Sequence, residues 1–254
     1  MKKILVIGIG AGNPEQITVE AINALNRVDV IFVLDKGPQK NDLTRLRKEI
    51  CERYLKDRTP RIVEAKSPAR DAASPYKEGV DAWHAEKATI FRRLIDEELA
   101  ESECGAFLVW GDPSLYDSTL RILDQVAADG RTLFTCEVIP GISSIQVLAA
   151  RHRIPLNAIG EPVLITTGRK LAEGGFGAVE DRVVMLDGGA GLEAVAREDV
   201  EIFWGAYLGT EDEVLVAGRL PDVIDDIRRI RRERRAQKGW IMDTYLLRRS
   251  YRRI

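Results

Sequence analysis

Three glycine-bearing segments of the chain combine residue types that bind small polar ligands. The first is Gly8-Ile9-Gly10-Ala11-Gly12-Asn13-Pro14, the second is Trp110-Gly111-Asp112-Pro113-Ser114-Leu115-Tyr116, and the third is Pro140-Gly141-Ile142-Ser143-Ser144. Glycine lets the backbone approach a ligand closely, and a helix that starts just beyond it presents free amides to negative charge. Together the segments offer backbone amides, hydroxyls and one carboxylate. Each segment alone could equally be a tight turn whose Asp or Ser caps a helix.

The first segment also suggests a second hypothesis, because glycine-rich turns of this kind bind dinucleotides. The fingerprint G-x-G-x-x-G would place its third glycine at position 13, whereas the chain has Gly12. Asp35 lies at the end of the second predicted strand, where such enzymes hold a ribose-binding acid. A nicotinamide-dependent oxidoreductase is therefore an alternative, although it leaves the second and third segments without a role.

Histidine and cysteine are scarce, which limits other kinds of chemistry. The chain has two histidines, His84 and His152, and three cysteines, Cys51, Cys104 and Cys136. No two cysteines are spaced as C-x-x-C. We therefore expect no metal site, no disulfide framework and reduced thiols. The chemistry that remains would use carboxylates, hydroxyls, backbone amides or a bound cofactor.

The pattern of apolar residues places the three segments at the ends of strands. Short apolar runs alternate with amphipathic helices, which predicts a parallel sheet covered on both faces, because parallel strands need crossover connections. The predicted strands are 3–9, 30–34, 61–65, 106–110 and 135–139, and later helices cover 80–99 and 120–128. A first helix, capped by Asn13 with Pro14 in its first turn, would bury Val19, Ile22, Leu25 and Val28. The segments follow the first, fourth and fifth strands, at the carboxyl ends where α/β sheets bind ligands.

The second half of the chain predicts a different architecture. Five strands are expected at 163–167, 182–186, 201–208, 214–219 and 240–247, with helices at about 192–197 and 221–237. Short turns join several of these strands, which favours a mixed sheet. A length of 254 residues suits two small domains as well as one large one. We expect a first α/β domain over 1–155, ending in a helix at 143–152, and a second over 156–254.

Charge and hydropathy exclude some classes of protein. Lysine plus arginine, 38, nearly cancels aspartate plus glutamate, 40, which argues against a general nucleic-acid coat. There is no run of about 18 apolar residues, the length a membrane span needs. Gly8 and Gly10 interrupt the early apolar run that would otherwise resemble a signal peptide. We expect a cytoplasmic protein that binds neither membranes nor nucleic acid.

Arginines crowd the carboxyl end of the chain and allow three interpretations. They are Arg228, Arg229, Arg231, Arg232, Arg234, Arg235, Arg248, Arg249, Arg252 and Arg253. A solvated helix face is the first interpretation, since apolar residues at 223, 224, 227 and 230 mark a buried side and nearby acids balance part of the charge. RNA binding or RNA modification is the second. The third is attraction of a substrate with many carboxylates, because arginine pairs with carboxylates through two parallel hydrogen bonds.

The three glycine-bearing segments, in this order and spacing, resemble the tetrapyrrole methylase family. The pattern of five plus five strands also fits the family, so the resemblance covers nearly the whole chain. It implies two α/β domains of the class III S-adenosylmethionine methyltransferase type, with the active site in the cleft between them, and a homodimer. It further implies S-adenosyl-L-methionine as methyl donor, S-adenosyl-L-homocysteine as its product and a precorrin as substrate.

Within the family, Val80 with Trp83-His84, the long excursion between Asp35 and Gly111 and the arginine-rich tail resemble the member that removes an acetyl group. This implies methylation of precorrin-5 with loss of acetate to give precorrin-6A, in cobalamin (vitamin B12) biosynthesis. Another precorrin or cobalt-precorrin methyltransferase is the alternative within the family.

The resemblance also implies which residues contact the cofactor. They are Gly10, Ala11, Trp110, Gly111, Asp112, Leu115, Tyr116, Ser143, Ser144, Met185, Leu186, Ala217 and Gly218. The chain departs from the family at two places. Ala11 stands where the family commonly has proline, and the family usually has an aromatic residue paired with methionine near Met185.

The expected reaction makes modest demands on the protein. Methyl transfer needs alignment of donor and acceptor and exclusion of water, and Asp112 is the carboxylate we expect near the cofactor. Deacetylation needs a base for water and donors for the oxyanion. The candidates, in order, are Asp35, Tyr116 and His84. They could instead be a solvated loop acid, a packing tyrosine and a partly exposed helical histidine.

Overall fold

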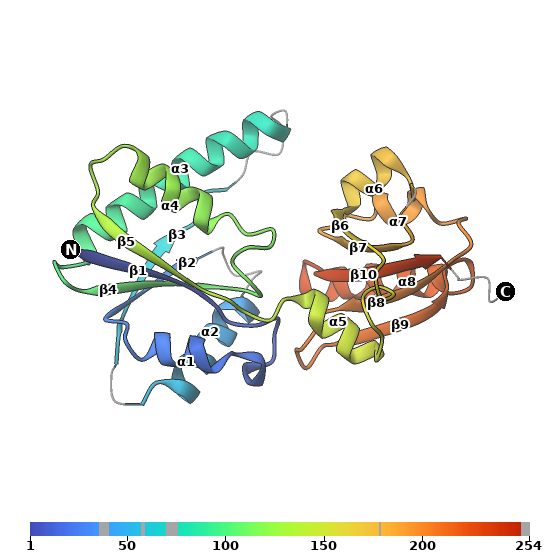
Figure 1. Ribbon diagram of the computed structural model, residues 1–254, viewed down its shortest axis with the longest axis horizontal. Coiled ribbons are helices and arrows are strands. Elements are labelled where there is room, and N and C mark those ends of the chain that lie inside the picture. Colours follow the sequence, from blue (N-terminus) through green and yellow to red (C-terminus); the bar gives the residue numbers. More distant parts are fainter. Residues whose placement is uncertain (36–40, 57–58, 70–75, 178, 250–254) are drawn as a thin grey trace. The chain divides into compact units, whose positions relative to one another are not determined.

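The computed structural model describes residues 1–35, 41–56, 59–69, 76–177 and 179–249, without the side chains of 41–44, 76 and 77. The chain divides into two compact units, Met1–Ser143 and Ser144–Ile254 (Figure 1). The sequence predicts the boundary at residue 155, whereas the units divide after Ser143. The reason is that the helix that starts at Ser144 packs on strands of the second unit. Each unit has its own sheet.

The first unit contains a parallel five-stranded sheet with the order β3-β2-β4-β1-β5, which confirms the predicted sheet type. Its strands are β1 (Lys2–Gly8), β2 (Val30–Asp35), β3 (Arg61–Lys66), β4 (Cys104–Val109) and β5 (Phe134–Ile139). Its helices are α1 (Val19–Leu25), α2 (Asn41–Tyr54), α3 (Tyr76–Glu98) and α4 (Thr119–Ala128). In Figure 1, α3 and α4 cover one face of this sheet, and α1 and α2 cover the other.

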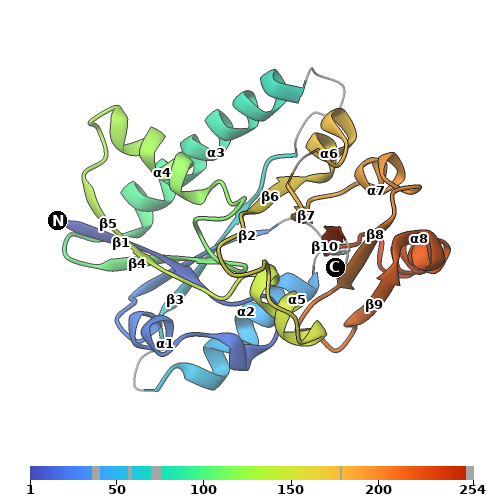
Figure 2. The same ribbon diagram turned by 45° about the vertical axis from the view of Figure 1, so that its right-hand side comes forward.

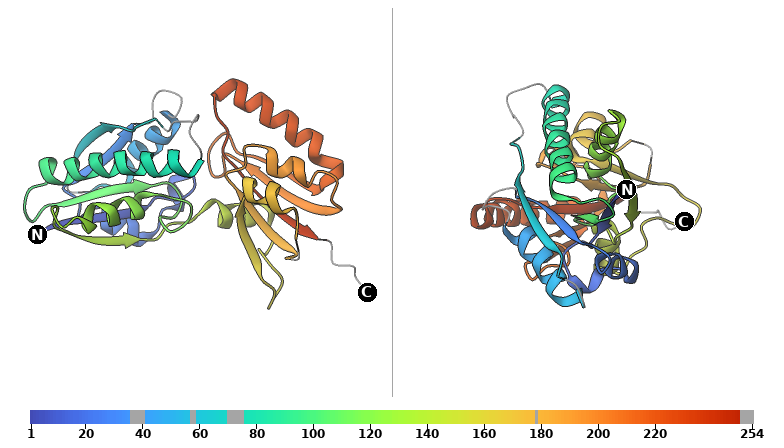
Figure 3. Two further views of the ribbon diagram at one scale, coloured as in Figure 1. Left: turned by 90° about the horizontal axis from the view of Figure 1, so that it is seen from above. Right: turned by 90° about the vertical axis from the view of Figure 1, so that its left-hand side faces the viewer.

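Apolar side chains on both faces hold this sheet between its helices, because successive residues of a strand point to opposite sides. In β1, Leu5 and Ile7 belong to the core with α1 and α2, whereas Ile4 and Val6 belong to the core with α3 and α4. Figure 3 shows α3 and α4 side by side over that second core. There the ring of Phe91 stacks on Phe107, with ring centroids 4.2 Å apart.

The second unit contains the mixed five-stranded sheet that its sequence predicts, with the order β6-β7-β10-β8-β9. Its strands are β6 (Val163–Thr167), β7 (Asp181–Met185), β8 (Val200–Ala206), β9 (Val214–Arg219) and β10 (Asp243–Arg249). Its helices are α5 (Ser144–His152), α6 (Gly168–Gly174), α7 (Ala190–Ala194) and α8 (Leu220–Lys238). Only β6 and β7 pair in parallel. Helices α6, α7 and α8 share a core with Trp204 and Tyr245, and α5 lies on the other face (Figure 2).

The first helix differs from its prediction. Asn13 and Pro14 begin a short 3-10 turn, Pro14–Gln16, and α1 starts afresh at Val19. Thr18 caps it, since its hydroxyl accepts a hydrogen bond from the Ala21 amide at 3.0 Å. Of the four residues predicted to be buried, Leu25 and Val28 are buried and Ile22 packs partly buried against the core, but Val19 is 73% exposed. Ala21 and Ala24 complete the buried side.

The helices also bear on membrane insertion. Within the part of the chain that the structure describes, every helix is too short or too polar to cross a bilayer.

The aromatic core of the first unit gives a direct test of this packing. Phe91 is fully buried, and replacement by alanine would leave a cavity beside Phe107. We expect Phe91→Ala to lower the free energy of unfolding by about 3–5 kcal/mol. Leu133→Ala is the matched control, because Leu133 is 70% exposed in the same unit and should change stability by less than about 0.5 kcal/mol. Urea unfolding of both variants measures this, and equal losses would contradict the described core.

Candidate functional site

The strand order brings the three glycine-bearing segments together. Strand β1 lies between β4 and β5, and all three run in parallel, so the loops that follow them leave the same edge of the sheet side by side. The amide of Gly111 donates to the carbonyl of Gly10 at 2.8 Å, and the two residues form an isolated β-bridge. We call these three loops of the first unit, 8–14, 110–116 and 140–143, the glycine rim.

Glycine is required at the centre of this rim because the backbones touch there. A Cβ atom on Gly8 would lie 2.6 Å from the backbone nitrogen of Gly141, and one on Gly141 would lie 2.1 Å from the carbonyl oxygen of Gly111. These neighbours are backbone atoms, which cannot rotate away as a side chain can. The motif therefore has a packing role in this chain that is independent of any ligand.

Asp112 fastens two of the loops to each other. One carboxylate oxygen accepts a hydrogen bond from the Gly141 amide at 2.8 Å, and the other accepts from the amide and hydroxyl of Ser114. Partial burial alone would raise the pKa of Asp112, but these hydrogen bonds outweigh it and lower that pKa. The carboxylate is therefore charged at neutral pH and already serves three donors of the protein.

The other predicted cofactor residues of the rim lie around these contacts. Ala11 and Ser143 are buried, and Ser143 lies against the backbone of Gly111. Leu115 is half-buried, and Tyr116 is 45% exposed with a left-handed φ of 52°. Ser144 is different, because it starts α5 in the second unit and its hydroxyl lies 3.0 Å from that of Thr244.

A cavity of about 90 Å³ lies behind the rim, at the ends of β2 and β4. Aromatic residues line it together with charged ones, among them Trp110, Arg47, Lys87 and Asp117. The indole nitrogen of Trp110 is buried and has no hydrogen-bond partner among the residues that the structure describes. A polar group of a ligand could satisfy it, since an unpaired buried donor is costly.

The three predicted catalytic residues all lie at this end of the first unit. Asp35 is exposed at the end of β2, which pairs with β4 at Phe32 and Phe107. Tyr116 belongs to the rim, and His84 lies on α3 one turn before Lys87, which lines the cavity. Burial raises the pKa of Tyr116, which keeps the phenol protonated. Burial and the nearby cations Lys87 and Arg121 lower the pKa of His84, which favours a neutral imidazole.

The predicted residues of the second unit fall into two separate places. Met185 ends β7, and Leu186 follows it, 63% exposed and with a left-handed φ of 52°. Ala217 and Gly218 lie in β9, at the far edge of the sheet order β6-β7-β10-β8-β9. Three strand spacings of about 4.8 Å separate β7 from β9. The sheet therefore does not bring these two pairs together.

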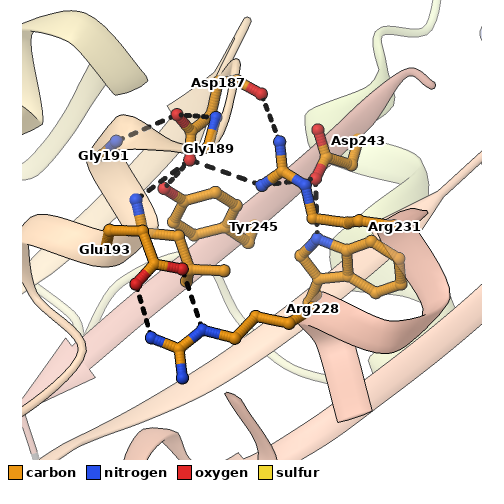
Figure 4. Close-up of polar contacts among 10 residues, drawn as sticks. Asp187, Gly189, Gly191, Glu193, Arg228, Arg231, Asp243 and Tyr245 are labelled. Atoms are coloured by element: carbon orange, nitrogen blue, oxygen red, sulfur yellow. Dashed lines mark hydrogen bonds and ion pairs between the residues drawn. The ribbon is translucent and has the colours of Figure 1, made fainter. Parts of the chain in front are cut away.

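Asp187, directly after Leu186, is the centre of a buried polar cluster that sequence reasoning missed (Figure 4). Its carboxylate accepts hydrogen bonds from the amides of Gly189, Gly191 and Leu192 and from the Tyr245 hydroxyl at 2.8 Å. These bonds hold the strand end and the start of α7 in a fixed position. Asp187 is the residue that closes the β7–α7 loop.

Arg231 joins this cluster to α8. One of its nitrogens donates to the Asp187 carbonyl, and the other lies 3.5 Å from an Asp187 carboxylate oxygen and 3.3 Å from one of Asp243. Asp243 also accepts a hydrogen bond from the Trp204 indole at 2.8 Å. The sequence contains a partial signal, since Asp187 precedes a glycine-rich helix start as a cap would, but Arg231 is hidden within an arginine run.

The arginine-rich helix fits the solvated-face interpretation in part. Ile224 and Ile227 are buried, and ion pairs neutralise Arg228, Arg229 and Arg234. Arg231 is an exception, because it is only 8% exposed. Arg248 also pairs with the buried Asp181. Arg252 and Arg253 lie outside the described residues.

The sheet order argues against the dinucleotide hypothesis. In dinucleotide-binding sheets the strand that carries the ribose-binding acid lies next to the strand that carries the glycine turn. Here β4 lies between β2 and β1, so Asp35 is one strand removed from Gly8–Gly12.

Comparison with known proteins agrees with this fold. The chain belongs to the Tetrapyrrole (Corrin/Porphyrin) Methylases, whose family model matches residues 3–224. It is 52% identical to the precorrin-6A synthase (deacetylating) of Sinorhizobium sp over 251 residues, which cover 98% of this chain and 96% of that protein.

Solved structures show the same architecture. A cobalamin synthesis related protein (CobF) from Corynebacterium diphtheriae is 41% identical, covers 98% of both chains and has a TM-score of 0.83. The uroporphyrin-III C-methyl transferase of Thermus thermophilus, complexed with S-adenyl homocysteine, is 17% identical, covers 96% of each chain and has a TM-score of 0.58. The second likeness shows the fold, which is that of the class III methyltransferases.

The contact of the rim backbones can be tested by adding one methyl group. We expect Gly141→Ala to destabilise the chain by at least about 2 kcal/mol, because the new Cβ would overlap backbone atoms of Gly111 and Gly8. Gly174→Ala is the control, since a Cβ there meets no atom within 4 Å. It should be neutral or slightly stabilising at its helical position. Thermal unfolding distinguishes the two, and a neutral Gly141→Ala would refute the described contact.

The buried cluster predicts a particular pH dependence of stability. Burial raises the pKa of Asp243 to about 6, and Arg231 counteracts this only in part. Because the pKa is higher in the folded chain than its unfolded value of about 4, Asp243 stabilises the fold below that value and loses this contribution as the pH rises through about 6. Asp243→Asn cannot ionise, so we expect its melting temperature to fall less than that of the wild type between pH 5 and pH 7.5. Parallel curves would contradict this role of Asp243.

Proposed function

We propose that the chain is an S-adenosylmethionine-dependent methyltransferase that converts precorrin-5 to precorrin-6A with loss of acetate, in cobalamin biosynthesis. The observation that carries the proposal is the 52% identity, over 98% of this chain, to the precorrin-6A synthase (deacetylating) of Sinorhizobium sp. Membership of the tetrapyrrole methylases supports the same class of reaction and substrate.

The residues of the glycine rim fit the expected cofactor. S-adenosylmethionine carries hydroxyls, a carboxylate and an adenine, all of which bind to backbone groups and to single donors or acceptors. The rim offers closely spaced backbone at Gly10 and Gly111, the exposed ring of Tyr116 and the unpaired indole N–H of Trp110. We propose that these residues hold the cofactor in the first unit, and that Met185 and Leu186 contribute contacts from the second.

Asp112 has a positioning role in this proposal. Its carboxylate fixes the relative position of Gly141 and Ser114, so the two loops present their amides in a set geometry. The cofactor supplies an activated methyl group, and the protein aligns the accepting ring carbon and excludes water. A direct contact between Asp112 and the cofactor remains a prediction from the family resemblance.

Deacetylation needs a base and a hydrogen-bond donor, and His84 and Tyr116 are suited to these two different roles. Water must attack the acetyl carbonyl, the bond from that carbonyl to the macrocycle must break, and the electron pair left on the ring carbon must pass to a proton or to the transferred methyl group. A neutral His84 can accept the proton of the attacking water, and the protonated Tyr116 phenol can donate to the carbonyl oxygen as charge develops. We propose these two roles, with Asp35 as the alternative base.

Two further features are proposed from the family resemblance alone, namely a homodimer and a cytoplasmic location. The alternative function is that of another precorrin or cobalt-precorrin methyltransferase. The precorrin-2 C(20)-methyltransferase of Sinorhizobium sp is 27% identical over 77% of this chain, against 52% over 98% for the deacetylating enzyme, and this difference favours the latter.

The proposal is tested by incubating the protein with S-adenosylmethionine and precorrin-5 and analysing the products by mass spectrometry. We expect one added methyl group and one acetate for each molecule converted. Tyr116→Phe should slow acetate release by about 100-fold, the effect of removing one oxyanion donor, while stabilisation by S-adenosylhomocysteine persists. Leu133→Ala serves as the control. Methylation without acetate release in the wild-type protein would point to the alternative enzyme, and no methylation of any precorrin would refute the class.

A further inference from the structure

A second cavity, of about 370 Å³, opens within the second unit beside the buried Asp187 cluster. It lies between the start of α7 and one face of α8, and its lining consists of Gly188, Gly189, Leu192, Glu193, Arg228, Arg231, Arg232 and Arg235. The four arginines share one helix face because each lies three residues from one of the others and four residues from another. Its volume lies in the range of small-ligand pockets, which begins at about 300 Å³.

The four guanidinium groups differ in what they already bind. Arg228 makes two hydrogen bonds to Glu193, the one carboxylate in the lining (Figure 4). Arg231 is occupied by Asp187 and Asp243. By contrast, the guanidinium groups of Arg232 and Arg235 make neither an ion pair nor a hydrogen bond with any residue in the described part of the chain. The cavity therefore carries uncompensated positive charge.

The other arginines of α8 make this contrast meaningful. Arg229 pairs with Asp226 and Glu233, and Arg234 approaches Asp212 at 3.9 Å, and neither lines the cavity. Both arginines outside the cavity thus have acidic partners, whereas two of the four arginines inside it, Arg232 and Arg235, have none among the described residues. A face meant only for solvation would not need this division.

The opposite wall of the cavity is kept open by glycine. A Cβ atom on Gly188 or Gly189 would meet no atom within 4 Å, so these residues leave space rather than fill it. They follow Met185 and Leu186, which the family resemblance assigns to the cofactor. Strand β10, which comes after α8, starts beside the end of β7, where Thr244 pairs with Met185. The carboxyl half of α8 and the β7–α7 loop therefore belong to the same edge of the sheet.

We propose that this cavity binds carboxylate groups of the tetrapyrrole substrate, with Arg232 and Arg235 as the binding residues. The inference rests on the proposed function, because precorrins carry many acetate and propionate side chains. Two arginines three residues apart present two planar forks on one helix face, and each fork matches a carboxylate. The pair Arg228–Glu193 joins α8 to α7, and the pair Arg231–Asp187 joins α8 to the β7–α7 loop, so both walls of the cavity are connected.

The test compares two double variants of equal charge change. Arg232→Gln with Arg235→Gln removes the proposed binding residues, and Arg229→Gln with Arg234→Gln is the control on the same helix. The probe is uroporphyrin I, a stable tetrapyrrole with eight carboxylates, and its Kd is measured by fluorescence quenching. A second arm repeats the titration with inorganic phosphate as competitor, and a third measures thermal stabilisation by S-adenosylhomocysteine.

We expect the first double variant to weaken uroporphyrin binding at least 10-fold, the control to change it less than 2-fold, and both to keep the S-adenosylhomocysteine shift. Millimolar phosphate should compete weakly. Equal weakening in both variants, or no change in either, overturns the proposal, as does phosphate that competes as well as the tetrapyrrole. Loss of the S-adenosylhomocysteine shift in the first variant alone would assign the cavity to the cofactor instead. A wild-type protein without that shift would count against the proposed function and not against the cavity.

Discussion

Backbone contact between three loops is the constraint on which the first unit depends. Gly8, Gly111 and Gly141 approach so closely that no side chain fits between them, and the Asp112 carboxylate locks two of their loops together. The contact exists because β1 lies between β4 and β5, so the three loops leave adjacent strands. Any ligand at this edge meets backbone whose position is already fixed, and such preorganisation lowers the cost of binding.

In the second unit a loop is also fixed in position, but by side chains rather than by backbone contact. There a charged residue, Asp187, fixes a loop through amides of α7 and through Tyr245, and Arg231 ties the loop to α8. A buried ion pair adds little net stability, because desolvation offsets the attraction, but losing one partner is costly. Its value here is geometric. It ties α8 to the loop that contains the exposed, left-handed Leu186, and the cavity lies beside this contact.

The sequence was sufficient to predict most of the fold. Apolar runs marked all ten strands, most clearly β1, β2 and β4, which are largely buried in the middle of the parallel sheet. The alternation of strands and helices then leaves few topologies. Helix α6 was not predicted, since Gly168–Gly174 buries only Leu171 among its large apolar residues and begins at Thr167, a cap with no apolar periodicity after it. The first helix was misplaced because a 3-10 turn has the same opening residues, Asn13 and Pro14, as an α-helix.

The candidate site was predictable only where its residues are close in sequence. The motifs predicted the glycine rim. The role of Asp112 within it could not be predicted, because that role depends on a hydrogen bond to a residue 29 positions away. Arg231 and Asp187 are 44 positions apart, and nothing in a run of arginines distinguishes the one that is buried. Pairings between distant residues carry no local pattern, so burial and partnership had to come from the structure.

The order of the strands also determines when the first sheet can form during synthesis. Strand β1 is synthesised long before its two neighbours, which are β4, at Cys104–Val109, and β5, at Phe134–Ile139. Strands β2 and β3 can pair much earlier, since Val30–Asp35 and Arg61–Lys66 are close in the chain. The pairing of β1 must therefore wait for about a hundred residues, and long-range parallel pairing of this kind is slow and prone to aggregation. The glycine rim cannot close until Gly141 has emerged, so this edge of the sheet is the last part of the first unit to be completed.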